Sequence, residues 1–253
     1  MPELQRADMW KRISAALLDV ILLAIVAVGM AYVLTTVLGY DRHEAQFNAI
    51  AAAYESEYGV SFDVSGEELA AMTEEERAQF NLASEAFSKD EEANRVYALM
   101  FNLTLVITSL GILAACLLME FVLPLLLGNG QTLGKKIFGI GVMRVDGIKL
   151  PAVLLFVRTV LGKYAVELMV PVYIFVMLMF GMMDIAGTVL IFGLLIVQIV
   201  LVATSRTRSP IHDRLAHTVA VDFASQRIFD SVEAREAYRE RIHSEIADAP
   251  NDH

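Results

Sequence analysis

Four long apolar stretches dominate the pattern of hydrophobic and polar positions along the chain. They cover residues 13–40, 96–119, 164–183 and 185–205, and the charged residues inside them are Asp19 and Glu167. A helix needs about 20 largely apolar residues to cross the hydrocarbon of a bilayer. The pattern therefore predicts an all-α polytopic membrane protein with four transmembrane helices, over about 13–38, 98–122, 165–183 and 186–204.

The polar segment between the first two stretches, residues 41–95, has a helical pattern of its own. Apolar side chains recur there at steps of three and four residues, at Phe47, Ile50, Tyr54 and Tyr58. Such steps place them on one face of a helix. Three sequences fit the S/T-x-x-E capping box that marks a helix start, namely Ser65–Glu68, Thr73–Glu76 and Ser88–Glu91. We expect two or three short amphipathic helices that form a small acidic cap.

The segment after the second stretch is basic and rich in glycine. The spacing of its glycines fits neither a phosphate-binding loop nor a dinucleotide fingerprint. It predicts a short helix around residues 132–138, followed by a hairpin turn at Asp146-Gly147, a strong signal for a two-residue turn. Residues 150–161 predict an amphipathic helix on the membrane surface that leads into the third span.

A short polar segment follows the fourth stretch. Pro210 predicts a turn, His212 and Asp213 begin a short helix, and residues 218–223 read as a strand. That strand could pair with the 140–150 hairpin and form a small cytoplasmic sheet. The remaining tail, residues 224–253, predicts a charged amphipathic helix.

Composition and charge agree with a membrane protein and orient it. The chain of 253 residues is 56% hydrophobic, with a mean hydropathy of +0.54, whereas soluble domains are about 45–50% apolar. Residues 41–95 hold 14 acidic and 4 basic side chains, which equals the net charge of −10 of the whole chain. Lysine and arginine near membrane ends stay on the cytoplasmic side. We expect a multi-pass protein of a bacterial cytoplasmic (inner) membrane, with residues 41–95 outside and both termini in the cytoplasm.

Several kinds of chemistry are not expected. The chain has one cysteine, Cys116, which excludes an intrachain disulfide framework or a zinc site of several thiolates. His212 and Asp213 are adjacent in sequence, and no nucleophile is marked near them. We therefore expect no enzyme activity, metal, cofactor or nucleic-acid partner.

Two acidic residues in the predicted spans are candidates for a functional site. An ionisable group inside a membrane is costly, so by default it indicates function. Asp19 lies about 13 Å past Trp10 along a helix axis, and Arg12 lies two turns before it on nearly the same face. Glu120 reaches a comparable depth on the antiparallel second span. If the two carboxylates face each other, one holds a proton.

A direct Arg12–Asp19 pair is a stretch over two helical turns, so another element is expected to supply a partner for Asp19. The candidates are Arg158, Lys163, His212 and Glu120. The pairing is either a structural tie between the spans and the cytoplasmic face or part of a transport site. The residues alone leave both open.

Three pieces of sequence, in this order, resemble the RDD family of membrane proteins. They are "WKRISAALLDVILL", "GQTLGKKIFGIGVMRVDG" and "SPIHDRLAHTVAV". The family takes its name from one arginine and two aspartates. Arg12 matches the arginine, Asp19 the first aspartate and Asp213 the second. The resemblance frames a membrane domain over residues 8–223, with the acidic insertion 41–95 and the tail helix 224–253 as additions. It implies a fold group and no established activity.

Two functions remain in view. The first is transport of a small cation, a proton or a small polar solute through a site built around Asp19 and Glu120. Four spans are few for a monomeric transporter, so this function calls for a homo-oligomer in the lipid bilayer. The second is a non-transporting scaffold or accessory subunit. In that role Arg12, Asp19, Arg158 and Asp213 lock the spans to the cytoplasmic face, while the acidic cap and the C-terminal helix meet other proteins.

Overall fold

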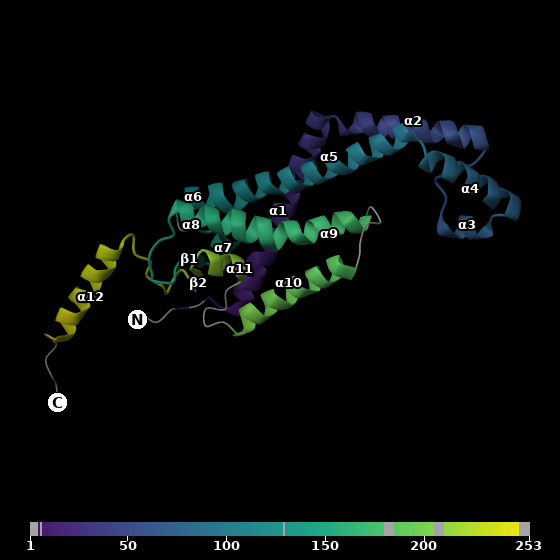
Figure 1. Cartoon of the computed structure of the whole chain (residues 1–253). Helices are drawn as coiled ribbons and strands as arrows, with labels where there is room; N and C mark the ends of the chain where they lie inside the picture. Colours follow the sequence, from purple (N-terminus) through teal and green to yellow (C-terminus); the bar gives the residue numbers. More distant parts are fainter. Residues whose placement is uncertain (1–4, 6, 129, 180–184, 205–209, 248–253) are drawn as a thin grey trace. The chain divides into compact units, whose positions relative to one another are not determined.

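The protein is described by a computed structural model, shown in Figure 1, that covers residues 5, 7–128, 130–179, 185–204 and 210–247. The chain divides into two compact units. One unit comprises Met1–Met30 with Gly111–His253, and we call it the platform unit. The other comprises Ala31–Leu110, and we call it the cap unit. Most of the predicted turn between the third and fourth spans, residues 181–184, lies outside the described residues.

Three helices are long and apolar enough to cross a membrane. The first is α1 (Met9–Leu38). The second runs through α5 (Glu91–Cys116), η1 (Leu117–Val122) and α6 (Leu123–Leu127). The third runs through α8 (Ala152–Phe156), η2 (Val157–Met169) and α9 (Val170–Met179). The protein is thus mostly helical with membrane-spanning candidates, as the sequence predicts.

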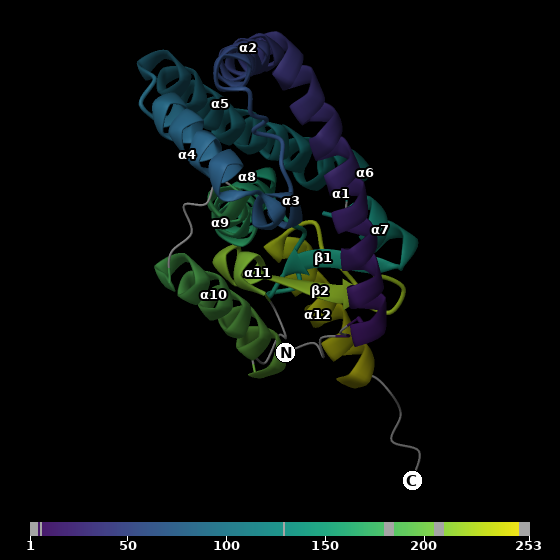
Figure 2. The ribbon, with the colours of Figure 1, turned by 90° about the vertical axis from the view of Figure 1, so that its right-hand side faces the viewer.

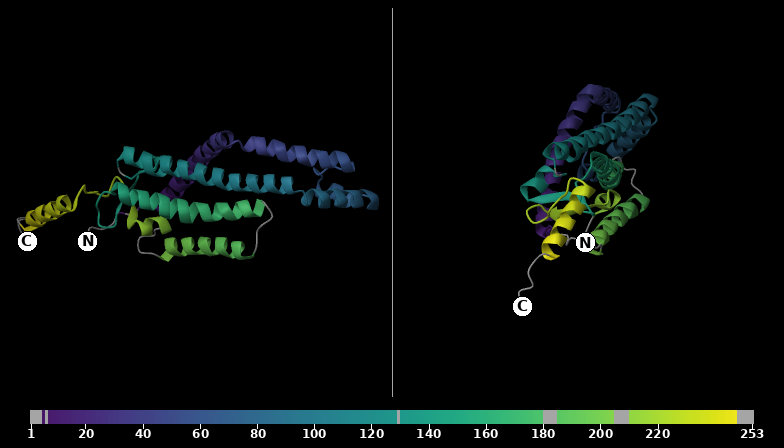
Figure 3. Two further views of the ribbon diagram at one scale, coloured as in Figure 1. Left: turned by 45° about the horizontal axis from the view of Figure 1, so that its top comes forward. Right: turned by 90° about the vertical axis from the view of Figure 1, so that its left-hand side faces the viewer.

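The predicted fourth span corresponds to α10 (Ile185–Thr204), which lies alongside α9 (Figure 3). Its strongly apolar described stretch, Phe192–Leu201, is shorter than a span. The fourth crossing therefore stays a prediction.

The predicted surface helix over residues 150–161 is wrong. From Ala152 the chain forms one continuous helix with the third candidate span, Ala152–Leu178, so no separate surface helix precedes it. The charge that made the segment look amphipathic, Arg158, is only 1% exposed, because it pairs with an acid of the protein rather than with headgroups.

Two segments of these helices, η1 and η2, are π-helices. A π-helix is bonded from residue i to i+5, so it has more residues per turn than an α-helix. Arg158, Lys163 and Glu167 are spaced five and four residues apart within η2. The wider turn brings all three toward one side, whereas an α-helix would place Arg158 and Glu167 on opposite faces. The winding of η2 thus gathers its charges.

A small antiparallel sheet joins two distant parts of the chain. Strands β1 (Ile140–Arg144) and β2 (Thr218–Asp222) pair with Ile140 opposite Asp222 and Arg144 opposite Thr218 (Figure 2). This confirms the predicted strand pairing. The predicted turn at Asp146-Gly147 also forms, because the Arg144 N–H donates to the Ile148 carbonyl over 2.9 Å and Gly147 has a φ of 86°.

Two short helices flank this sheet. Helix α7 (Leu133–Ile137) begins at Thr132, whose hydroxyl accepts from the Lys135 N–H, and α11 (Ile211–Leu215) begins after Pro210. Both were predicted. We call residues 132–150 and 210–222 the sheet platform. The N-terminal segment is tied to it, since the Asp222 N–H donates to the Gln5 carbonyl over 2.9 Å.

Apolar packing fixes the helices of the platform unit against one another. Leu23 of α1 packs with Ala115, Cys116 and Met119 of the second helix. A separate cluster under the sheet contains Met143, Val219 and Val221, all fully buried.

The tail helix begins later than predicted, as α12 (Val232–Ala247), and the predicted residues after 247 lie outside the described ones. The residues before it run beside the turn of the sheet platform, where the Lys149 N–H donates to the Phe229 carbonyl over 2.8 Å. Arg235, Tyr238 and Ile242 are partly buried and recur at helical spacing. The Arg235 guanidinium donates to the Asp146 carbonyl over 2.9 Å. The start of the tail therefore belongs to the platform unit.

The cap unit contains α2 (Tyr40–Tyr58), α3 (Gly66–Ala71), α4 (Glu74–Ser88) and the first part of α5. The predicted apolar stripe is confirmed, because Phe47 and Tyr54 both contact Phe87, with ring centroids 5.6 Å and 5.5 Å apart. The capping boxes at Ser65 and Thr73 are also confirmed. That this unit lies outside the cell stays a prediction.

The third predicted capping box, at Ser88, is wrong. Ser88 is the last residue of α4, and its hydroxyl donates to the Glu85 carbonyl over 2.8 Å. The Asp90 carboxylate instead accepts from the Ala93 N–H over 2.7 Å at the start of α5. A carboxylate accepts this bond as well as a hydroxyl does, and it also suits the positive end of a helix.

Candidate functional site

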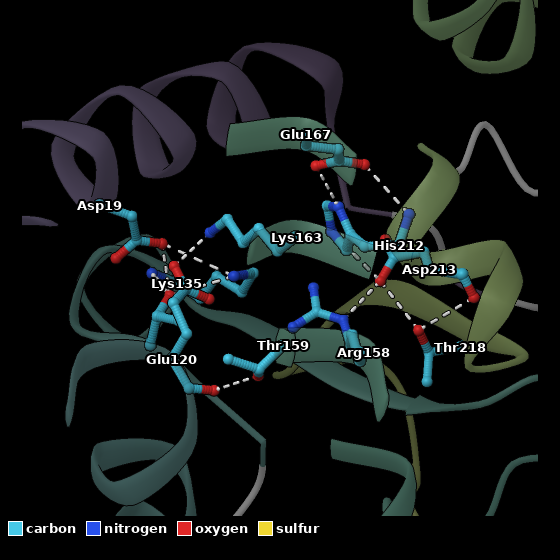
Figure 4. Close-up of polar contacts among 11 residues, drawn as sticks. Asp19, Glu120, Lys135, Arg158, Thr159, Lys163, Glu167, His212, Asp213 and Thr218 are labelled. Atoms are coloured by element: carbon cyan, nitrogen blue, oxygen red, sulfur yellow. Dashed lines mark hydrogen bonds and ion pairs between the residues drawn. The ribbon is translucent and has the colours of Figure 1, made fainter. Parts of the chain in front are cut away.

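Asp19 lies in α1 and is only 5% exposed. One carboxylate oxygen accepts the Gly134 N–H over 2.8 Å, and the other accepts the hydroxyl of Thr132 (Figure 4). The Lys135 ammonium lies 3.6 Å from the second oxygen. Asp19 thus binds the first turn of α7, where helix N–H groups lack partners within the helix. We call this contact the Asp19 latch.

Gly134 is required for that approach. A Cβ at this position would lie 2.4 Å from the Ala15 carbonyl oxygen and 2.8 Å from an oxygen of Asp19. Neither distance is tolerable, and the first obstacle is backbone. The glycine in "GQTLGKK" therefore allows α7 to lie directly against α1, so that its amide reaches the carboxylate.

Glu120 lies in η1 and pairs with the Lys163 ammonium of η2. Its backbone carbonyl accepts the Thr159 hydroxyl over 2.9 Å, so two bonds join η1 to η2. One oxygen of Glu120, Oε2, is buried with no hydrogen-bond partner among the described residues. Glu120 is therefore an acid paired with a lysine of the third helix.

Arg158 and Asp213 form a buried ion pair between η2 and α11. The guanidinium Nε lies 2.7 Å from Asp213 Oδ1, and the residues are 1% and 3% exposed. The Thr218 hydroxyl donates to the same oxygen over 2.8 Å. Burial alone would raise the pKa of Asp213, but Arg158 above all, and then His212, hold it well below its usual range. Asp213 is therefore an anion that fixes α11.

Glu167 and His212 make a second contact between η2 and α11, which we call the Glu167 latch. One oxygen of Glu167 accepts the His212 backbone N–H over 3.0 Å, and the other lies 2.7 Å from Nδ1 of the ring. Gly162 makes the close approach possible, because a Cβ there would lie 2.6 Å from the His212 Cα. A short helix of the platform is again held by a carboxylate of a membrane helix.

A comparison with known families supports the resemblance seen in the sequence. The family model described as "RDD family" matches residues 6–217, which is most of the chain. This chain belongs to the RDD family. No curated protein and no solved structure matches it significantly. In this RDD protein, Asp19 and Asp213, the two aspartates assigned to the family pattern, each hold a different platform helix.

A cavity of about 350 Å³ lies among these contacts in the RDD protein. Side chains from α1, α7, η2, α11 and the sheet line it. Its ionisable lining residues are Arg12, Asp19, Lys135, Arg158, Lys163, Glu167, His212 and Asp213. The cavity therefore joins the Asp19 latch, the Glu167 latch and the Arg158–Asp213 pair in one polar site.

The structure brings together five of the six residues that the sequence singled out around this cavity. Arg12, Asp19, Arg158, His212 and Asp213 line it, whereas Glu120 lies beside it through its pair with Lys163. The residues expected as direct partners of Asp19 pair with other groups: Arg158 with Asp213, Lys163 with Glu120, and His212 with Glu167.

Sequence reasoning missed Thr132, Gly134 and Lys135 as the partners of Asp19 in the RDD protein, and Glu167 as the partner of His212. A signal was present for both. Thr132 is the capping residue of a predicted helix, whose free amides need acceptors. Glu167 is the one charge inside the third apolar stretch, which makes it a default candidate for function. Across the described ranges no group of three metal-binding side chains gathers.

Proposed function

We propose that this RDD protein transports a small polar solute, a small cation or a proton across the membrane, through the polar site around Asp19. Glu120 assists through Lys163, and the protein acts as a transporter rather than as an enzyme. The observation that carries the proposal is the cavity, because ionisable side chains from two candidate spans line it together with groups of the sheet platform.

The cost of the arrangement supports a role beyond packing. An ionisable group inside a membrane protein is expensive unless it pairs or lines a cavity. Apolar residues of similar volume often stabilise a fold as well as a buried ion pair does. The chain nevertheless keeps Asp19 with Lys135, Glu120 with Lys163, and Arg158 with Asp213 around one cavity. Such pairs can exchange a proton or a charged partner when the helices move.

The fold also supports four crossings with both termini in the cytoplasm. Residues 132–150 and 210–222 form one sheet platform, and Gln5 and Lys11 bind Asp222 of the same platform. This shared platform supports a chain that returns to its starting side after α1 and α5, and again after α9 and α10. Basic residues on that side favour the cytoplasm. We propose the bacterial inner membrane as the location and a homo-oligomer as the working form.

This orientation can be tested with single cysteines in a Cys116→Ser background. An impermeant maleimide applied to spheroplasts should label Glu75→Cys in the cap unit and leave Glu240→Cys in α12 unlabelled until the membrane is opened. Labelling of both positions from outside would contradict an even number of crossings.

Flux from vesicles tests the transport function. The full chain is reconstituted as wild type, as Asp19→Asn and as Lys136→Gln, which removes an exposed charge of α7 away from the cavity. Wild type and Lys136→Gln should move protons or a solute, and folded Asp19→Asn should lose that movement. Absence of any flux in the wild type, over a panel of cations, anions and neutral solutes, would contradict the proposal.

A specific observation favours the second candidate, a scaffold or accessory subunit. Both oxygens of Asp19 are already engaged by Thr132 and Gly134, which is what a structural tie requires. In that role the acidic cap and the C-terminal helix would meet protein partners. The two functions separate on one comparison: a scaffold gives no flux in the wild type, and Asp19→Asn lowers the thermal midpoint of the purified protein without any activity to lose.

A further inference from the structure

The hydrogen-bond donors and acceptors that line the cavity are not evenly used. Asp19 has both oxygens engaged by donors of α7, and Glu167 has both engaged by His212. Asp213 Oδ1 accepts from both Arg158 and Thr218. Asp19 and Glu167 therefore have both oxygens engaged by the protein itself, and Asp213 has one of its two engaged. A cation that entered would find acceptors most of which already hold partners.

The hydrogen-bond donors that line the cavity, in contrast, are only partly used. A guanidinium has five N–H donors, and within the described residues Arg158 uses Nε, toward Asp213. Figure 4 shows its two terminal nitrogens turned away from Asp213. An ammonium has three donors, and Lys163 directs one bond to Glu120. Both residues line the cavity, so their remaining donors are available to a ligand there.

The charge around the cavity leads to the same conclusion. Four cationic side chains line it, Arg12, Lys135, Arg158 and Lys163, against the three carboxylates Asp19, Glu167 and Asp213. The lining therefore holds one more cationic side chain than carboxylates, although the charges of the whole site balance once Glu120, the partner of Lys163, is counted. Glu120 does not line the cavity and balances Lys163 from behind. A ligand inside the cavity therefore meets more positive than negative groups.

We propose that the cavity binds a small oxyanion, such as a phosphate or carboxylate group, through the unused donors of Arg158 and Lys163, with Lys135 and Arg12 adding positive charge. The terminal nitrogens of an arginine match the spacing of oxygens in both groups. The inference names the solute class for the transport proposed above, and it rests on that function only for the step across the membrane.

Lys135 links the anion to a proton. Burial lowers the pKa of Lys135, Glu120 opposes that shift, and Arg158 and Lys163 add to it, with Asp19 again opposing. Thr132 is its neutral neighbour. A bound oxyanion favours the charged ammonium and raises the pKa of Lys135. In the pH range between the pKa values of the empty and the occupied cavity, binding therefore takes up a proton, and affinity falls as the pH rises through the pKa that Lys135 has in the empty cavity.

An equilibrium binding experiment tests this without transport. The full chain is placed in nanodiscs of phosphatidylcholine and titrated with inorganic phosphate or succinate by calorimetry, at constant ionic strength set with choline chloride. The same titration is repeated in discs that contain phosphatidylglycerol, whose headgroup phosphate could occupy the cavity first. The variants are Arg158→Lys, which keeps the charge toward Asp213 but loses the fork, Lys163→Gln, and the exposed control Lys136→Gln.

The wild type and Lys136→Gln should bind an oxyanion, more weakly at higher pH. Arg158→Lys and Lys163→Gln should bind it at least about tenfold more weakly, which is the effect of one lost charged hydrogen bond. Binding in neutral lipid assigns a soluble anion. A thermal midpoint raised by phosphatidylglycerol, with loss of the phosphate response, assigns the lipid headgroup as the competing source. Both support the inference if the cavity variants abolish the effect.

The inference is overturned if neither phosphate, succinate nor phosphatidylglycerol acts on the wild type, or if the cavity variants respond as the wild type does. Should the variants not fold, the wild type decides the matter: a response to choline or sodium equal to that of the oxyanions overturns it. Oxyanion binding without flux would contradict the transport function but support the anion site. Flux that does not depend on oxyanions would support the transport function but contradict the anion site.

Discussion

The Asp19 latch and the Glu167 latch hold their short helices by the same kind of contact, but the two helices differ in how many contacts hold them. In each, a carboxylate on a membrane helix accepts a backbone N–H from the first turns of a five-residue platform helix, and a glycine permits the approach. The Asp19 latch holds α7 by one carboxylate. The Glu167 latch has the Arg158–Asp213 ion pair beside it, so α11 is held twice.

The difference shows what a five-residue helix needs. Isolated helices of this length are unstable in water, so their position depends on what binds their ends. For α7 that partner is Asp19, which explains why this residue is both buried and fully bonded. Helix α11 is held by Glu167 and also by the ion pair of Asp213 with Arg158, and this ion pair places Arg158 at the cavity. The Asp19 latch therefore mainly fixes the position of α7. The Glu167 latch and the Arg158–Asp213 pair fix the position of α11, and they also leave hydrogen-bond donors of Arg158 available to the cavity.

Breaking the ion pair beside the Glu167 latch should have the largest effect. Asp213→Asn leaves the Arg158 guanidinium buried without a counter-charge, which costs about 3–5 kcal/mol. We expect little folded protein, as measured by size-exclusion yield and thermal midpoint in detergent. Combining Asp213→Asn with Arg158→Met should recover much of the loss, because no charge then remains unpaired. A double variant as unstable as the single one would contradict this reading.

Gly134→Ala should come next, because it breaks the Asp19 latch. The added methyl would lie 2.4 Å from the Ala15 carbonyl oxygen, so α7 must move away from Asp19. Overpacking costs about 1–3 kcal/mol, and the lost bonds to a charged group add about 1.5–3 kcal/mol. Gly193→Ala in α10 is the matched control, since nothing lies within 4 Å of a Cβ there. Equal thermal midpoints for the two variants would refute the close approach.

Thr132→Val should be milder. It removes the hydroxyl that donates to Asp19 and caps α7, but Asp19 keeps the Gly134 N–H and Lys135. We expect a loss of about 1–2 kcal/mol, typical of a lost cap. Thr132→Ser, which restores the hydroxyl, should return the thermal midpoint close to that of the wild type. If Val and Ser behave alike, the hydroxyl contributes nothing to the latch.

The sequence was sufficient for features that depend on local patterns. The apolar stretches, the cap helices, the turn at Asp146-Gly147 and the pairing of β1 with β2 all follow from periodicity and turn chemistry. The sequence was not sufficient where a charged side chain forms an ion pair with a residue far along the chain. Arg158 was assigned to a membrane surface because nothing near it in sequence shows that Asp213, 55 residues later, neutralises it.

The π-winding was also beyond sequence patterns. Periodicity arguments assume 3.6 residues per turn, and on that assumption Arg158 and Glu167 face opposite ways. The wide turns of η2 reverse that conclusion. Asp19 and Asp213 could be recognised as important from the resemblance, but their partners could not, because they depend on how α7 and α11 approach the spans.

The smallest expected effect contrasts these buried carboxyls with exposed ones in the cap unit. Bonds to the Ser65 and Thr73 backbone N–H groups lower the pKa of Glu68 and Glu76. A lowered pKa adds stability above the unfolded value, near 4.3, which is lost as the pH falls through the folded value. Glu76→Gln should flatten that acid dependence slightly. The thermal midpoint measured from about pH 5 to 3 checks it, and a steeper dependence would contradict it.

The most direct measurement of the central claim is proton movement driven by an oxyanion gradient. Vesicles that contain the full chain and a trapped pH dye receive inorganic phosphate outside, at constant ionic strength. The wild type should acidify the lumen as phosphate enters with a proton, and folded Lys163→Gln should not, while Lys136→Gln should match the wild type. No acidification by the wild type, or equal acidification by Lys163→Gln, would contradict transport through this cavity.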